Sequence, residues 1–107
     1  MPNATVTTFA GKAATTGSSD GLGSAALFND PASIAIDSTG NAFVCDRSNH
    51  LIRKITPSGY VTTFAGSAGV TGSADGVASA ARFNGPDSIT IDSIGNLYVA
   101  EMNSHLI

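Results

Sequence analysis

Several residue types are scarce in this chain of 107 residues. Tryptophan is absent, cysteine occurs once, and charged side chains make up 12% of the residues, about half the usual share of a soluble globular protein. A single cysteine excludes an intrachain disulfide framework and a zinc site built from cysteines. The five Lys and Arg residues are scattered along the chain, and no apolar run approaches the ~20 residues that span a bilayer. We therefore expect neither a nucleic-acid partner nor a membrane partner.

The strongest positive signal is an internal repeat. The segment 6–11, with the sequence Val-Thr-Thr-Phe-Ala-Gly, recurs unchanged at 61–66. The same offset of 55 residues relates the rest of the chain without insertion or deletion, and well over half of the compared positions are identical. The chain is therefore predicted to be a single repeat region over residues 1–107, with unit one at about 6–60 and a truncated unit two at about 61–107.

Each unit predicts a meander of short antiparallel strands. In unit one, four runs rich in apolar residues and Thr are separated by polar turns, at 33–36, 42–45, 50–55 and 60–65. The first two runs are apolar on both faces, which is typical of strands that are covered on both sides. The last two carry Arg53, Lys54 and several Thr, so we expect burial to fall from the first strand to the fourth. The insert before the first strand predicts one helical turn at 24–28, anchored by Phe28.

A four-stranded sheet that is covered on both faces and repeated along a chain is typical of a propeller. We therefore predict an all-β fold of β-propeller blades, with two four-stranded antiparallel blades per chain. A β-sandwich is the alternative. It buries one face of each sheet and does not require a repeat, so we favour the propeller.

The residues also resemble a known family. The triplet Asn49-His50-Leu51 is the signature of the NHL repeat, and the surrounding pattern is similar to NHL blades over almost the whole chain: Phe28-Asn29, Pro31, Ile36-Asp37, Gly40-Asn41 and the strand from His50 to Ile55. In unit two the triplet becomes Ser104-His105-Leu106, and Asp46 is replaced by Glu101. The resemblance implies a β-propeller, for which six blades is a common number.

Two blades leave one apolar face bare at each end, so we expect the chain to bind copies of itself. Residues 1–10 are predicted to supply the outer strand of a blade that another chain completes. The predicted assembly residues are Thr5, Val6, Thr7, Thr8, Phe9, Ser104, His105, Leu106 and Ile107. Head-to-tail contacts of this kind close a ring, and we expect a trimer with six blades or, next, a tetramer with eight. The alternative origins, a fragment of a longer natural propeller or a designed two-blade chain, stay open.

The loops predict where a ligand would bind. In a propeller, the turns after the second strand of each blade and the connections between blades meet on one face. We predict that this face is the candidate binding surface for a protein or small-molecule ligand, formed by Asp46, Arg47, Asn49, Glu101, Met102 and Asn103.

Residues that recur at the same place in both units are interpreted first as structural. His50 and His105 each open the third strand, and a lone His supplies only one metal ligand. Cys45 aligns with Ala100, which indicates a small packing position rather than a catalytic thiol. We therefore predict no catalytic residue, no cofactor and no metal site.

The recurring aspartates favour turns. Asp37 and Asp92 lie in predicted hairpin turns, where carboxylates accept hydrogen bonds from nearby backbone N–H groups. Asp20 and Asp75 lie in the inserts that are rich in Ser and Gly. Turn formation is the favoured interpretation for this second pair, and weak calcium binding is the alternative.

Three classes of function fit these observations. The favoured hypothesis is a non-enzymatic propeller building block that self-assembles and serves as a scaffold or binding module. The alternatives are a fragment of a propeller enzyme, such as a metal-assisted lyase or hydrolase using Asp46, Glu101 and the two His, and a lectin-like sugar-binding propeller. The lack of an asymmetric acid–base or metal cluster weighs against the enzyme, and the scarcity of aromatic residues weighs against the lectin. The sequence does not indicate a cellular compartment.

Overall fold

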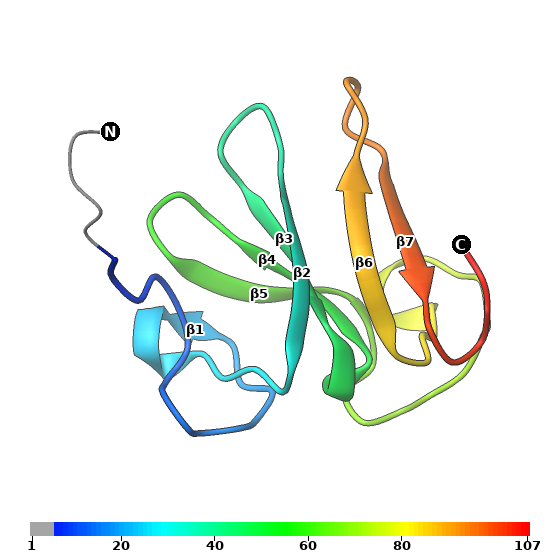
Figure 1. Ribbon diagram of the computed structural model, residues 1–107, viewed down its shortest axis with the longest axis horizontal. Helices are drawn as coiled ribbons and strands as arrows, with labels where there is room; N and C mark the ends of the chain where they lie inside the picture. Colours follow the sequence, from blue (N-terminus) through cyan, green and yellow to red (C-terminus); the bar gives the residue numbers. More distant parts are fainter. Residues whose placement is uncertain (1–5) are drawn as a thin grey trace.

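The strands of the protein form two antiparallel sheets, as described for residues 6–107 by a computed structural model (Figure 1). The first sheet has the strand order β1-β5-β4-β3-β2, with β1 (Gly21–Leu22), β2 (Pro31–Ile36), β3 (Ala42–Asp46), β4 (Leu51–Ile55) and β5 (Tyr60–Gly66). The second sheet pairs β6 (Pro86–Ile91) with β7 (Leu97–Glu101). Residues 6–107 also contain three short 3₁₀ turns: η1 (Gly23–Ala25), η2 (Arg47–Asn49) and η3 (Ala78–Ala80). Within the described part of the chain, no helix has the length and apolar character needed to cross a membrane.

Strands β2 to β5 form the predicted meander. Each pairs antiparallel with the next, and Val44 of β3 lies between Ile34 of β2 and Arg53 of β4. The turn between β2 and β3 needs a left-handed residue, which Gly40 supplies at φ +91°. Gly95 takes φ +94° at the same place between β6 and β7, so the two hairpins close in the same way.

The insert before β2 adds a short strand that the sequence did not predict. Gly21 and Leu22 pair with Val61 and Tyr60, so β1 extends the first sheet beyond β5. The predicted helical turn is confirmed slightly earlier in the chain, as η1, and Phe28 packs partly buried against the core as expected.

The structure corrects the number of strands in unit two. Its sheet contains only β6 and β7 among the described residues, and 104–107 continue it through a single backbone hydrogen bond, from Glu101 N to Leu106 O at 2.9 Å. Residues 6–10, predicted as an outer strand, form no strand in this single chain, and Thr5 lies outside the described residues. A strand requires a hydrogen-bonded neighbour, and neither segment has one along its length.

The core lies on the two faces of β3, which is buried along its whole length. On one face is a cluster of Ala26, Ala42, Val44, Ile55 and Val61; on the other, Phe43, Cys45 and Ile52 pack with Ile89 of unit two. The expectation that the first strand is the driest is wrong. Ile34 and Ile36 of β2 are 57% and 60% exposed, because nothing covers that face of the sheet edge.

The two sheets meet along their first strands. β2 and β6 lie side by side in the middle of the molecule, whereas the two ends of the described chain lie on opposite sides (Figure 1). The amide of Ile89 in β6 donates to the Ser33 hydroxyl of β2 at 3.3 Å.

Candidate functional site

The structure separates the six residues predicted to form one binding face. Asp46 is completely buried and Asn49 is 8% exposed, so these two side chains hold the first sheet together instead of lining a surface. Arg47, Met102 and Asn103 do come together, around a surface depression of about 520 Å³. Glu101 lies in a different cavity, beside the second sheet.

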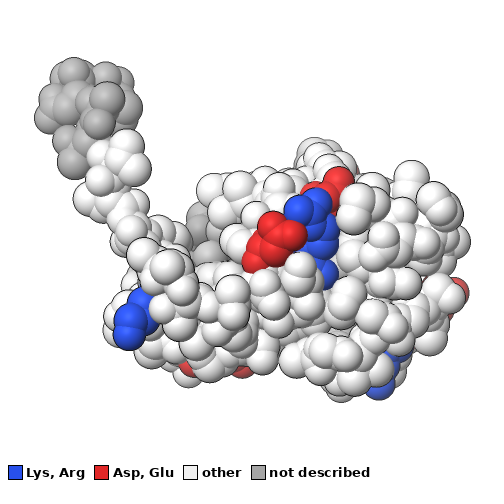
Figure 2. Space-filling view, turned by 60° about the horizontal axis from the view of Figure 1, so that its bottom comes forward, with Lys and Arg blue, Asp and Glu red and all other residues white. Residues whose placement is uncertain are grey.

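Arg47 connects the two units within that depression. Its guanidinium forms ion pairs with Asp30 at 2.8 Å and with Asp87 at 2.6 Å. The hydrogen bonds to Asp30 and then to Asp87 raise the pKa of Arg47, so the side chain stays charged. Charged side chains are few on the face of the molecule shown in Figure 2, where most of the surface is uncharged. The partly exposed cation is therefore already satisfied by this chain's own carboxylates.

Arg53 occupies a buried site that the sequence analysis did not identify. Its guanidinium donates to Asp46 Oδ2 at 2.8 Å and to Asp20 Oδ1 at 2.9 Å, and it lies 4.9 Å from the centre of the Phe28 ring. It also donates to the carbonyl oxygens of Leu27 and Ser19, at 2.7 and 2.9 Å. The available signal was an Arg within an apolar strand together with an Asp in the preceding insert. Asp20 is therefore an ion-pair partner rather than only a turn residue.

The carboxylate of Asp46 organises the groups around Arg53. Its Oδ1 accepts a hydrogen bond from Asn29 N at 2.8 Å, and its Oδ2 accepts one from Asn49 Nδ2 at 2.7 Å as well as that from Arg53. Buried charges are stable only when they are paired and hydrogen-bonded. Asp46 and Asn49 of the predicted face thus build the interior of the sheet.

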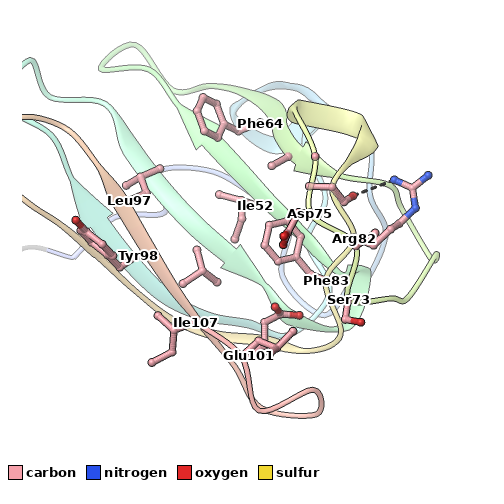
Figure 3. Close-up of a pocket in the computed structure, with 16 residues that line it drawn as sticks. Ile52, Phe64, Ser73, Asp75, Arg82, Phe83, Leu97, Tyr98, Glu101 and Ile107 are labelled. Carbon is pink, nitrogen blue, oxygen red and sulfur yellow. Dashed lines mark hydrogen bonds between the residues drawn. The ribbon is translucent and has the colours of Figure 1, made fainter.

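A cavity of about 500 Å³ lies beside the second sheet (Figure 3). Asp75, Glu101 and Phe83 are among the residues that line it. The guanidinium of Arg82 is bound to backbone carbonyls, those of Ala81 at 2.9 Å and of Ser79. The cavity therefore combines two carboxylates with an aromatic wall.

The two histidines and the cysteine, which were interpreted as structural from the sequence, lie at positions with a left-handed backbone or in the core. His50 sits just before β4 at φ +59°, and its Nδ1 accepts a hydrogen bond from Gly85 N at 3.1 Å. His105 has the same backbone conformation in unit two, at φ +59°. Cys45 is buried in the core, where desolvation first and the charge of Asp87 second raise the pKa of its thiol to about 12. A thiol with this pKa stays protonated at neutral pH, whereas the thiolate is the nucleophilic form.

Both hairpin aspartates accept the predicted hydrogen bonds. Asp37 Oδ1 accepts from the amides of Thr39 and Asn41, each at 2.9 Å. Asp92 Oδ1 accepts from the amides of Ile94 at 3.0 Å and Asn96 at 2.8 Å. These carboxylates therefore stabilise the two hairpin turns. In the described part of the chain, no group of three or more His, Cys, Asp or Glu is placed to hold a metal ion.

Comparison with known families confirms the resemblance. The NHL repeat model matches residues 28–55, which comprise β2, β3, η2 and β4 with the preceding Phe28-Asn29. The all-β fold of propeller blades is likewise confirmed by the solved structures to which the chain is similar.

Two of those structures come from Bacteroides thetaiotaomicron. One is a structural genomics protein of unknown function, 36% identical with a TM-score of 0.82, which matches over 87% of this chain and 24% of its own. The other is described as an auxiliary nutrient binding protein, 30% identical with a TM-score of 0.74, over 85% of this chain and 25% of its own.

A curated relative is the chloroplastic Protein SUPPRESSOR OF QUENCHING 1 of Arabidopsis thaliana. It is 34% identical over 92 residues, which are 85% of this chain and 9% of that protein. The chain therefore spans about a quarter of the solved structures described above and less than a tenth of this relative.

Proposed function

We propose, from an NHL repeat at residues 28–55 and from sheets that are β-propeller blades, that this chain is a non-enzymatic propeller building block. Its open sheet faces bind further copies head to tail, and the resulting ring presents the loop-rich face as a scaffold or binding module. The observation that carries the proposal is the packing between the two units inside one chain.

The internal interface is apolar and has two dissimilar halves. The first sheet contributes Phe43, Cys45 and Ile52, and unit two contributes Ile89 with the partly buried Phe83, Leu97 and Val99. Because the chain is a repeat, each half has a counterpart 55 residues away at an outer face.

Three of those counterparts are uncovered, whereas Ala42 and Val44, in the places of Leu97 and Val99, are buried in the first sheet. Tyr98 and Ile107, in the places of Phe43 and Ile52, are 49% and 93% exposed. Ile34, in the place of Ile89, is 57% exposed and lines an apolar groove of about 440 Å³ together with Phe9 and Phe28. The two open faces are therefore the two halves of a contact that the chain already makes once. A contact between unlike faces is heterologous, and it forms a ring when the rotation closes.

Residues 6–10 add a second reason for head-to-tail contact. Their sequence is identical to 61–65, which lies within β5 and pairs with β4. In the proposed ring, residues 6–10 of one chain form the outer strand beside residues 104–107 of the next. The assembly residues predicted from the sequence are retained in this proposal.

Native mass spectrometry and sedimentation velocity at micromolar concentration test the ring. We expect an assembly with three times the 10.7 kDa mass of the chain, or four times that mass as the next alternative. A folded species with the mass of one chain, or an assembly of any other size, contradicts the proposed ring.

Two matched lysine variants show whether the open face around Ile34 is responsible for assembly of the ring. Ile34→Lys places a charge in the proposed contact, and we expect it to convert the ring to single chains while far-UV circular dichroism is unchanged. Ile94→Lys is the control, because Ile94 is 83% exposed in the turn between β6 and β7 and lies outside the contact. Equal assembly masses for the two variants would count against a role of this face in assembly.

Metal analysis of the same preparation addresses the enzyme alternative. The proposal expects no stoichiometric zinc or calcium to copurify with the chain. A bound metal in a one-to-one ratio would instead support a metal-assisted enzyme. For the lectin-like alternative, selective retention on a glycan array would be the contrary result.

A further inference from the structure

One dipeptide of the chain has a sequence that favours attack of the backbone on a side chain. Asn84-Gly85 is the single Asn-Gly pair in the sequence, and it lies immediately before β6. In such a pair the backbone nitrogen of the glycine bonds to Cγ of the asparagine and expels its amide nitrogen, because glycine has no side chain to hinder the approach. The surrounding structure accelerates this reaction where a base takes the proton of the backbone nitrogen and a donor stabilises charge on the side-chain oxygen.

A base lies against the backbone nitrogen of Gly85. His50 Nδ1 accepts a hydrogen bond from Gly85 N at 3.1 Å, which is within the distance required of a general base. A ring nitrogen that accepts a hydrogen bond has a free lone pair, so it is able to take the proton of this amide. His50 follows η2 of unit one, whereas Gly85 belongs to unit two. The base therefore meets the dipeptide only in the folded chain.

A donor lies against the side-chain carbonyl of Asn84. Asn103 Nδ2 donates to Asn84 Oδ1 at 3.2 Å, so negative charge that develops on this oxygen during the attack is stabilised. Asn103 also packs over Gly85, where a Cβ atom would lie only 2.8 Å from Asn103 Nδ2. The glycine is therefore required both for the attack and for the close approach of this donor.

Water has access to the same place. Gly85, His50 and Asn103 all line the surface depression of about 520 Å³, and the side chain of Asn84 is half-buried. The ring closure itself consumes no water, but its cyclic product is hydrolysed by water. The depression therefore supplies the one co-reactant that the complete conversion needs.

Unit one contains the same backbone turn without the reacting groups. Asn29-Asp30 occupies the corresponding place, and Asp30 has φ +61° where Gly85 has φ +68°. The side chain of Asp30 takes the place of the glycine hydrogen. Ser48 stands where unit two has Asn103, and its hydroxyl lies 3.5 Å from Asp30 Oδ2 instead of contacting the side chain of Asn29. Asn29 is therefore an internal control for Asn84.

We propose that Asn84 is a self-modification site, at which His50 and Asn103 promote its conversion to aspartate and isoaspartate. Gly85 N gives its proton to His50 Nδ1 and bonds to Asn84 Cγ, whose carbonyl electron pair moves onto Oδ1 beside Asn103. The pair returns as the bond from Cγ to Nδ2 breaks, and His50 passes the proton to the leaving nitrogen, which departs as ammonia. Water then opens the five-membered imide at either carbonyl and restores the N–H of Gly85.

The conversion alters the contact between the two units. While the imide exists, Gly85 N has no hydrogen to donate to His50. The aspartate product adds a carboxylate close to Glu101, whose Oε1 accepts from Asn84 N at 2.8 Å, and isoaspartate lengthens the main chain just before β6. This inference goes beyond the building-block function, because it concerns a single event within one chain and does not depend on the ring.

Peptide mapping by mass spectrometry measures the conversion in the intact folded chain during storage at neutral pH. We expect the fragment with Asn84 to show the mass change from amide to carboxyl, with isoaspartate among its products, while Asn29 stays unchanged. The reference is a capped peptide with the sequence of residues 80–89, which lacks His50 and Asn103, and the folded chain should convert about tenfold faster or more. An equal or slower rate, as follows if the surrounding hydrogen bonds hold Gly85 N away from Cγ, overturns the proposal. Aspartate without isoaspartate contradicts the ring closure.

Two variants identify the base and the donor. His50→Asn places an oxygen where Nδ1 lies, so Gly85 N keeps an acceptor, and asparagine tolerates the left-handed backbone of this position. Its amide is not a base, and we expect conversion of Asn84 to slow about tenfold or more. Asn103→Ser removes the donor and should also slow it.

Asn96→Ser is the control for general loosening of the second sheet, because Asn96 lies in the turn at the other end of the hairpin and bonds to Asp92. Urea midpoints verify that each variant is folded. Unchanged rates in His50→Asn and Asn103→Ser, or equal slowing in Asn96→Ser, contradict the roles assigned to His50 and Asn103.

Discussion

Arg53 has the most demanding environment of any single residue in the structure. Its side chain and that of Asp46 are both completely buried, and its Nε is a buried atom with no hydrogen-bond partner. Burying two charges costs several kcal/mol for each ion unless their geometry and the surrounding hydrogen bonds compensate. The four oxygen acceptors and the Phe28 ring supply that compensation. The first sheet therefore depends on the arginine being present.

The burial of Arg53 predicts that this residue contributes much more to the stability of the chain than Arg47 does. Arg53→Gln leaves Asp46 charged and unpaired in the core, and we expect the free energy of unfolding to fall by about 3–5 kcal/mol. Arg47→Gln removes a cation that also pairs with two carboxylates but is partly exposed and screened by solvent, so it should lower the free energy of unfolding much less. Urea unfolding of both variants measures the difference. Losses of equal size would show that burial does not control the contribution of these ion pairs.

The hairpin turn is the element that the two units share most closely. In both units an aspartate accepts from two backbone amides, and the side chain of an asparagine four residues later donates to the same carboxylate. Each turn fixes the register of the strands on either side, because it places the first pair of facing residues. Its polar residues are therefore required by the sheet and need no ligand to explain them.

The turn predicts a loss of stability in acid. Desolvation opposes the shift, but hydrogen bonds from Asn41 and Thr39 lower the pKa of Asp37 from 3.8 to about 2. A group whose pKa is lower in the folded state stabilises it above the unfolded pKa, and this contribution is lost as the pH falls from about 4 to about 2. Asp37→Asn should therefore show less destabilisation over this interval than the unmodified chain, as measured by urea midpoints at both ends.

An NMR titration of the Asp37 carboxyl group measures the cause directly. We expect its midpoint near the lowered pKa of about 2, and Thr39→Val should move it upward because one hydroxyl donor is lost. A midpoint near 3.8 in the unmodified chain would contradict the hydrogen-bonding explanation.

At the scale of the whole molecule, the five-stranded first sheet stabilises the two-stranded second sheet through the contacts between them. A two-stranded hairpin is marginally stable by itself, whereas the first sheet has five strands, one core cluster and most of the buried residues of the second. β6 and β7 are held through Ile89, which is 6% exposed, and its partly buried neighbours Phe83 and Leu97. The second sheet should therefore be the less stable part of the chain.

Truncating the central contact should loosen the second sheet selectively. Ile89→Ala leaves a cavity at the interface, and we expect the amides of β6 and β7 to lose hydrogen-exchange protection while those of β3 and β4 keep it. Ile94→Ala removes the same atoms from an exposed turn and serves as the control. Uniform loss of protection in both sheets would instead show that the two sheets unfold as one unit.

The repeat and the alternation of apolar runs and turns were sufficient to predict the β2–β5 meander, its hairpin turns and the NHL resemblance. These features depend on local sequence, because strand pairs joined by tight turns need only nearby residues. The burial of Asp46 and Asn49, the pairing of β1 and the exposure of Ile34 could not be read in this way. They depend on contacts between segments that are not neighbours in the sequence, such as Asp46 with Asn29 and Gly21 with Val61, and on which sheet face lacks a neighbour.

The order of strands β2 to β5 and the identity of the repeat were therefore determined by the sequence alone. Tertiary structure decided that Arg53 is enclosed by Asp20, Asp46 and Phe28. The physical reason is that a charge becomes a buried ion pair or an accessible site only through its surroundings. Those surroundings come from an insert, a strand end and a neighbouring strand that meet only when the chain has folded.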